Sequence, residues 1–204
     1  MTRGGNLAIE SNIATLKLRA ASDRLYGLFQ DVQSEWLRIR KEHHSYQSLL
    51  LDYVFPIALL AHIAGFIGLL MRGVPVLSAF LHSLFYFAFS FLSVFIAAKV
   101  IAQLLPRFQS KVREIDAAKC FTFSMYPFLA AGFLHLFPWP LIGILEVLVA
   151  LYSFHVYWRG AELQLGIPAE RRVGFFFVSL LGTGIALGIA FYVVTLPLPR
   201  IVLG

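Results

Sequence analysis

Glu146 is the residue of this chain best placed to carry chemistry, because it is an ionisable group inside a long apolar stretch. Such groups are costly at membrane depth and mark either a functional site or a polar packing contact. A three-four spacing places Glu146 on one helix face with small and polar residues, namely Gly143, Ala150, Ser153, Tyr157 and Gly160. Small residues allow helices to approach closely, so we expect this face to point into a bundle. Glu146 is then either a proton or cation site, or a hydrogen-bonded acid that holds helices together.

Histidine occurs once in each of the first four apolar stretches, a distribution that raises the question of a metal or haem site. These residues are His62, His82, His135 and His155. Counting along the expected helices places His62 near the membrane midplane, His82 and His135 near one surface and His155 near the other. Because only His82 and His135 share a depth, we expect no bound metal, haem or other cofactor, and we expect interfacial or hydrogen-bonded histidines instead.

Familiar catalytic motifs are missing from the sequence. It contains no Gly-x-Ser-x-Gly, no His-Glu-x-x-His and no phosphate-binding glycine loop ending in Lys-Ser/Thr. The one cysteine, Cys120, cannot form an internal disulfide, and no Cys/His spacing resembles a zinc site. The sequence therefore predicts a non-enzymatic protein with no catalytic residues.

The elements that must position these residues are long apolar helices. Hydrophobic residues make up 59% of the chain and charged residues 14%, against about 25% charged residues in soluble domains. About 20 apolar residues are needed to cross a bilayer as a helix. The apolar stretches are residues 49–71, 76–105, 117–136, 141–158 and 173–196. The sequence therefore predicts an all-α, polytopic bundle of five transmembrane helices over residues 49–204, preceded by a separate N-terminal region over residues 1–48.

The Lys and Arg residues indicate the orientation of this bundle. They concentrate in the N-terminal region, between the second and third stretches, and between the fourth and fifth stretches. Five spans place all of these segments on one side, which the positive-inside rule identifies as cytoplasmic. The net charge of +6 lies in short loops beside apolar runs, which suits anionic lipid headgroups and not nucleic acid. We expect a cytoplasmic N-terminus and a C-terminus on the opposite side.

Several charged residues are expected at the cytoplasmic ends of the spans. They are Asp52, Lys99, Lys119, Arg159 and Glu162. Opposite charges at one level reduce the cost of burying each other, which predicts a salt-bridged polar layer. Alternatively, Lys99 and Arg159 extend separately to the headgroups. Pairs of small residues such as Gly184 and Gly188 fit close packing inside the bundle or a contact between two copies.

The N-terminal region has an amphipathic pattern from Tyr26 to His44. We expect a cytoplasmic amphipathic helix, either lying on the inner leaflet with Trp36 as its membrane anchor or docked on the protein's own loops. The uncharged turn at residues 137–140 predicts a tight hairpin between the third and fourth spans, with Trp139 as an anchor on the opposite membrane surface.

Three passages resemble the prokaryotic branch of the Yip family of membrane proteins, named for interaction with Ypt/Rab-type GTPases. They are LFQDVQSEWLRIRKEH followed by LLLDYVFPIALLAHIAGFIG, then YPFLAAGFLHLFPWP, then ALYSFHVYWRGAELQLGIPAERR. The resemblance covers roughly residues 28–196 and implies a five-helix bundle without a catalytic centre. The eukaryotic signature Asp-Leu-Tyr-Gly-Pro is replaced by the segment at residues 52–56, Asp-Tyr-Val-Phe-Pro, which weakens the case for a GTPase partner.

Three functions follow as hypotheses. The resemblance implies a non-enzymatic protein of the cell membrane, by preference the bacterial inner membrane, that organises lipids or partner proteins through its N-terminal region or as a homo-oligomer. Glu146 instead indicates a small proton, ion or solute transporter or channel. The histidines leave a third hypothesis, a membrane subunit of a redox complex.

Overall fold

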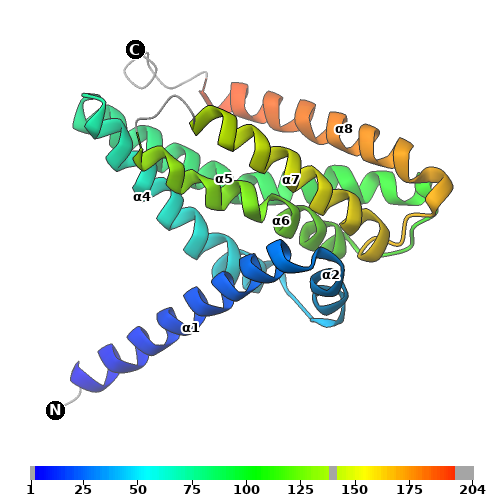
Figure 1. Cartoon of the computed structure of the whole chain (residues 1–204), viewed down its shortest axis with the longest axis horizontal. Coiled ribbons are helices and arrows are strands. Elements are labelled where there is room, and N and C mark those ends of the chain that lie inside the picture. The colour runs from blue at the N-terminus through cyan, green and yellow to red at the C-terminus, as the bar shows by residue number, and fades with distance from the viewer. Residues whose placement is uncertain (1–2, 138–141, 196–204) are drawn as a thin grey trace.

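The computed structural model describes residues 3–137 and 142–195, with side chains from Thr15 onward except that of Leu16. All of its regular elements are helices (Figure 1). The bounds are α1 Arg3–Gln30, α2 Val32–Lys41, α3 Tyr46–Ser48, the π-helical η1 Leu49–Val54, α4 Phe55–Met71, α5 Val76–Leu104, η2 Leu105–Phe108, α6 Glu114–Ala131, η3 Gly132–Leu136, α7 Ile142–Leu163 and α8 Ala169–Thr195.

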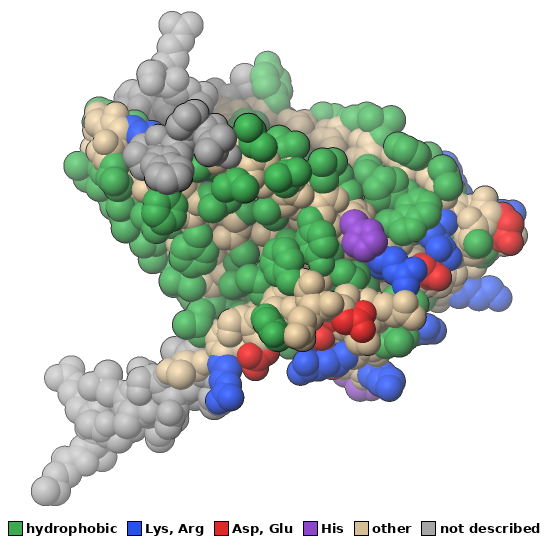
Figure 2. All heavy atoms as spheres, viewed as in Figure 1, with side chains coloured by type: hydrophobic (Ala, Val, Ile, Leu, Met, Phe, Trp, Pro, Cys, Tyr) green, Lys and Arg blue, Asp and Glu red, His purple; other side chains and the backbone are tan. Residues whose placement is uncertain are grey.

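Five helical segments of the described chain are long and apolar enough to span a membrane, as predicted. They run over Tyr46–Met71, Val76–Phe108, Glu114–Leu136, Ile142–Leu163 and Ala169–Thr195. The fourth span is longer than predicted, because α7 continues past residue 158 to Leu163. Large apolar side chains cover the flank of the bundle, whereas charged side chains gather at the end that carries α2 (Figure 2). We call the α2 end the polar end.

The segment predicted as one amphipathic helix over Tyr26–His44 forms the end of α1 and the whole of α2. The helix breaks at Asp31, whose carboxylate accepts hydrogen bonds from the backbone N–H groups of Gln33 and Ser34 and so caps α2. Helix α2 packs against α7, and α1 extends away from the bundle (Figure 1). Leu28, Trp36 and Ile39 of this segment are buried against the protein, whereas Phe29 is 52% exposed. The predicted single amphipathic helix is therefore not confirmed.

Helix α6 lies at the centre of the bundle, between α5 and α7, and is the most buried of the five spans. Small residues set the distance between α4 and the chain after α6: a Cβ added at Gly132 would lie 2.7 Å from the Cβ of Ala61. Gly184 and Gly188 behave differently, because an added Cβ at either position would meet no atom within 4 Å. The predicted use of small residues inside the bundle therefore holds for α4 and not for this pair on α8.

Candidate functional site

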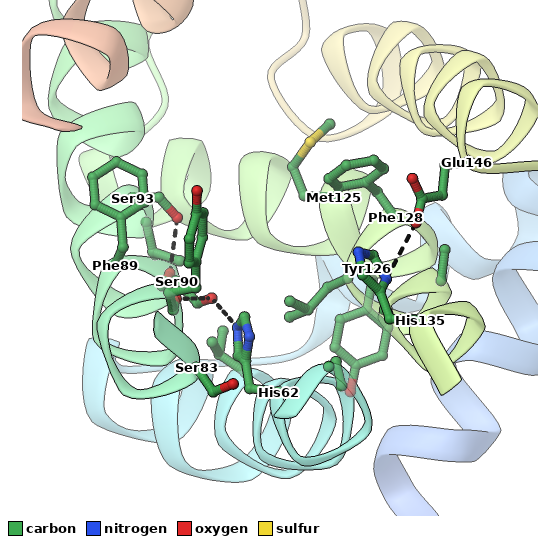
Figure 3. Close-up of a pocket in the computed structure, with 18 of the residues that line it drawn as sticks. His62, Ser83, Phe89, Ser90, Ser93, Met125, Tyr126, Phe128, His135 and Glu146 are labelled. Carbon is green, nitrogen blue, oxygen red and sulfur yellow. Dashed lines mark hydrogen bonds and ion pairs between the residues drawn. The ribbon is translucent and has the colours of Figure 1, made fainter. Parts of the chain in front are cut away.

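A cavity of about 550 Å³ lies inside the bundle, between its middle and the end opposite the polar end. Residues of η1, α4, α5, α6, η3, α7 and α8 line it, and most of the lining is apolar. Its polar side chains converge from two sides: His62 and Ser90 face the space from α4 and α5, and His135 and Glu146 face it from η3 and α7 (Figure 3). A largely apolar cavity with a few converging polar groups is the usual form of a small-molecule site.

Glu146 and His135 form a close pair at one edge of this cavity. The His135 Nδ1 lies 3.2 Å from the Glu146 Oε1, an oxygen that is itself buried. The contact lacks hydrogen-bond geometry, so the carboxylate retains capacity to accept further donors. The side chains of His135 and Glu146 are 47% and 30% exposed, so both remain partly accessible at this edge of the cavity.

His62 lies on the opposite wall and is held by α5. Its Nε2 is 3.0 Å from the Ser90 hydroxyl, which donates in turn to the backbone carbonyl of Tyr86. Because that hydroxyl proton is directed at the carbonyl, the Ser90 oxygen is the acceptor and His62 Nε2 the donor. His62 is thereby fixed in orientation as a hydrogen-bonded side chain.

Thr122 of α6 adds a polar group that the sequence pattern did not single out. It lines the cavity, is 4% exposed, and its hydroxyl has no hydrogen-bond partner. A buried hydroxyl without a partner costs about 1–3 kcal/mol, so Thr122 is a polar group that the packing around the cavity leaves unsatisfied. In the sequence, Thr122 is marked only by being a polar residue inside an apolar span.

The histidines do not form a metal centre in the described part of the chain. His62, His82 and His135 line the cavity together, whereas His155 lies on the outer surface of α7. Within residues 3–137 and 142–195, no group of three His, Cys, Asp or Glu side chains has an arrangement suited to a metal ion.

Ser153 and Tyr157 lie on the same face of α7 as Glu146, closer to the polar end than the cavity. Both are buried, and the Tyr157 hydroxyl donates to the Ser179 hydroxyl of α8 at 2.8 Å. The Ser153 hydroxyl has no partner. The half of the predicted polar face that is nearer the polar end thus joins α7 to the bundle. Gly143, at the other end of this face, is exposed.

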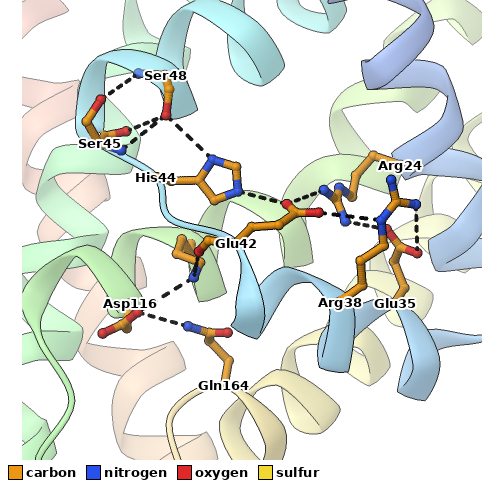
Figure 4. A network of polar contacts seen from close by, with 10 residues as sticks. Arg24, Glu35, Arg38, Glu42, His44, Ser45, Ser48, Asp116 and Gln164 are labelled. Carbon is orange, nitrogen blue, oxygen red and sulfur yellow. Dashed lines mark hydrogen bonds and ion pairs between the residues drawn. The ribbon is translucent and has the colours of Figure 1, made fainter.

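A second set of polar residues closes the polar end, around Arg24 of α1 (Figure 4). Arg24 is 3% exposed, forms ion pairs with Glu35 and Glu42, and lies over the rings of Tyr53 and Phe123. The other members of this Arg24 network are Arg38, His44, Asp116, Lys119 and Gln164. It ties α1 and α2 to α6 and to the loop after α7.

Electrostatics within the Arg24 network favours fixed charges. Burial alone would lower the pKa of Arg24, but hydrogen bonds to Glu42 and Tyr53 outweigh it and raise that pKa. Burial would raise the pKa of Glu42, yet Arg24 and His44 hold it below its usual value. Burial lowers the pKa of His44, and the contact with Glu42 only partly opposes this effect. At neutral pH the network therefore contains charged Arg24 and Glu42 beside neutral His44.

The charged residues predicted to form one layer are paired, mostly with other partners. Of that set, Arg159 and Glu162 meet each other at 2.8 Å, and Glu162 also meets Arg172. The remaining pairs are Lys17–Asp52, Lys99–Glu114 and Lys119–Asp116. Lys119 is almost fully buried and donates to the backbone carbonyl of Glu42. These pairs could not be predicted from the sequence, because most of them join residues on different elements.

Trp36 does not lie at the surface as the membrane-anchor interpretation required. It is completely buried, and its indole N–H donates to the backbone carbonyl of Val156 at 3.0 Å. Gly160 makes this docking possible, because a Cβ there would lie 2.6 Å from the Trp36 ring. The buried indole finds both apolar contact and an acceptor on α7, which the bilayer interior would not provide. Trp139, the other predicted anchor, lies outside the described residues.

These features define the class of protein. The five apolar spans, with their outward apolar side chains and a charged end, make the chain an integral, multi-pass membrane protein. Comparison with known protein families, with curated proteins and with solved structures finds no match.

Proposed function

We propose that this protein binds and transports a small solute through the cavity lined by His62, Thr122, His135 and Glu146. The observation that carries the proposal is the cavity itself, a space of about 550 Å³ among membrane-spanning helices with a carboxylate at its edge. A closely packed bundle with Glu146 enclosed between helices would have favoured a purely structural role.

The closure of the cavity at one end supports transport. It is open beside His135 and Glu146, whereas toward the polar end it meets the buried residues Val54, Val94 and Tyr126. Beyond them, the Tyr126 hydroxyl bonds to the carbonyl of Tyr53, and Arg24 covers Tyr53 and Phe123. We propose that a solute enters the cavity beside His135 and Glu146, and that the packed residues at the polar end separate the cavity from the other side of the membrane, as alternating access requires.

Proteoliposomes on a solid-supported membrane test this function, with transport currents recorded across a panel of cationic, anionic and neutral solutes. Gly65 lines the cavity and has no atom within 4 Å of an added Cβ, so Gly65→Leu fills space without a clash at that atom. The matched control is Gly184→Leu, which also meets open space but lies outside the cavity lining. We expect currents for some solutes in the wild type and the control and none in Gly65→Leu. Equal currents in all three proteins, or none with any solute, would refute transport through this cavity.

A second candidate function is the one that resemblance to the Yip family implies, the organisation of partner proteins at a cytoplasmic polar end in a bacterial inner membrane. It is supported by α1, which extends away from the bundle and exposes Leu18 and Tyr26 while Arg24 fixes its C-terminal part (Figure 1). A defined helix with exposed apolar side chains is a common docking surface.

Crosslinking in native membranes tests the second candidate without removing the buried part of α1. The double variant Leu18→Glu and Tyr26→Glu replaces the exposed apolar side chains by charged ones, and the control variant Ala20→Glu adds charge at an exposed position on the other side of α1. Loss of a reproducible crosslinked partner in the first variant only is the expected result. An unchanged set of partners would show that this surface of α1 is not the contact.

A further inference from the structure

Glu146 is the only carboxylate that lines the cavity within the described chain, and its position constrains the charge of the solute. Its buried oxygen Oε1 meets the His135 ring but accepts no hydrogen bond. A carboxylate in apolar surroundings is stabilised by each positive partner it gains. The Glu146 side chain is 30% exposed, so its accessible part can contact a positive group of a solute in the cavity.

The remaining lining suits the body of an organic cation. The rings of Tyr86, Phe89, Phe121, Tyr126 and Phe128 contribute to the cavity wall. Aromatic faces attract cations through the ring quadrupole, and they also accept apolar groups.

The other titratable groups at the cavity do not reverse this preference. Three histidines line the cavity: His62 is hydrogen-bonded to Ser90, His135 contacts Glu146, and His82 lies on α5. Arg72 is exposed at the end of α4, where water screens its charge. An anion would approach the Glu146 carboxylate without a fixed buried cation to compensate it.

We infer that the cavity is a site for organic cations with an aromatic or aliphatic body, held by Glu146 and by the aromatic wall. This inference rests on the proposed function and deepens it by naming the class of solute. A cation of this kind places its positive group beside Glu146 and its apolar part against α5 and α6.

Binding of three probes of similar size to the purified full-length protein tests the inference. The probes are benzyltrimethylammonium, benzyl alcohol and benzenesulfonate, and binding is measured by titration calorimetry at pH 7. The fixed charge of benzyltrimethylammonium does not change with pH. Binding is assigned to the cavity when it is lost in Gly65→Leu and kept in Gly184→Leu.

We expect benzyltrimethylammonium to bind at least tenfold more tightly than either other probe. Glu146→Gln should abolish this preference, and Glu146→Asp should keep part of it, which separates loss of charge from loss of folding. If benzyl alcohol or benzenesulfonate binds the cavity as tightly, the inference fails while solute binding by the cavity stands. If none of the probes shows binding sensitive to Gly65→Leu, the inference fails also, and the wider panel of transport currents decides the proposed function independently.

Discussion

Replacing Arg24 by methionine should release the N-terminal helices from the bundle. Arg24 is 3% exposed and compensates two carboxylates, one of which, Glu35, is itself buried. Methionine preserves an unbranched stem between the rings of Tyr53 and Phe123 but removes the charge. Removing one partner of a buried ion pair costs about 3–5 kcal/mol, because the other charge stays buried without compensation.

Arg38 provides a matched control because it approaches the same two carboxylates from the surface. It lies 3.9 Å from Glu35 and 3.4 Å from Glu42, and its side chain is 62% exposed. Exposed ion pairs contribute about 0–1 kcal/mol. Arg38→Met should therefore change the stability of docking little, although it removes an arginine from the same acceptors.

Hydrogen exchange of the α2 amides in detergent or nanodiscs measures both effects. Since about 1.4 kcal/mol corresponds to tenfold, Arg24→Met should accelerate opening of α2 by roughly a hundredfold to several thousandfold. The double variant Arg24→Met with Glu35→Met should recover much of the loss, because no buried Glu35 charge then lacks a partner. Equal acceleration by Arg24→Met and Arg38→Met would refute the argument that burial decides the value of these ion pairs.

Three further predictions concern helix packing: two test the docking of α2 on α7, and the third tests the contact between α7 and α8. Gly160→Ala places a Cβ 2.6 Å from the Trp36 ring and 2.9 Å from the Cys120 sulfur, so it should destabilise α2 docking by about 1–3 kcal/mol, measured by the same exchange. The control is Gly143→Ala, whose added Cβ meets no atom within 4 Å and should leave α2 docking unchanged. Acidification should also weaken docking: the pKa values of His44 and Glu42 are both lowered in the folded protein, so the undocked state binds more protons. Docking is therefore most stable above pH about 6.5 and weakens below it as His44 is protonated, and protonation of Glu42 weakens it further near pH 4.5 and below. Trp36 fluorescence should report this loss of docking. His44→Gln should remove the first phase of the loss, between pH 6.5 and 4.5. Tyr157→Phe should lower the thermal midpoint by the equivalent of about 1 kcal/mol, because it removes the hydrogen bond to Ser179, and an unchanged midpoint would show that this bond contributes nothing.

The helical class and the five spans could be predicted from sequence because they depend on local composition. An apolar stretch of about 20 residues must satisfy its own backbone hydrogen bonds in lipid, whatever the rest of the chain does. The spacing of Glu146, Ser153 and Tyr157 likewise follows from the helix repeat alone. The helix break at Asp31 was also a local signal, since aspartate is a favoured N-cap, but the continuous amphipathic pattern across it obscured the break.

Tertiary structure alone decided which groups meet. Glu146 pairs with His135 because the chain reverses direction between η3 and α7, and His62 pairs with Ser90 across two helices. Trp36 carried a pattern typical of a surface helix, yet it is buried, since an acceptor on α7 compensates its indole N–H. Arg24 is also buried, since the carboxylates of Glu35 and Glu42 compensate its charge. The cavity had no sequence pattern, because it is the space that seven elements, η1 among them, leave between them. Hydrophobicity and helix periodicity act over neighbouring residues and so appear in the sequence, whereas pairing and empty volume depend on how distant segments pack.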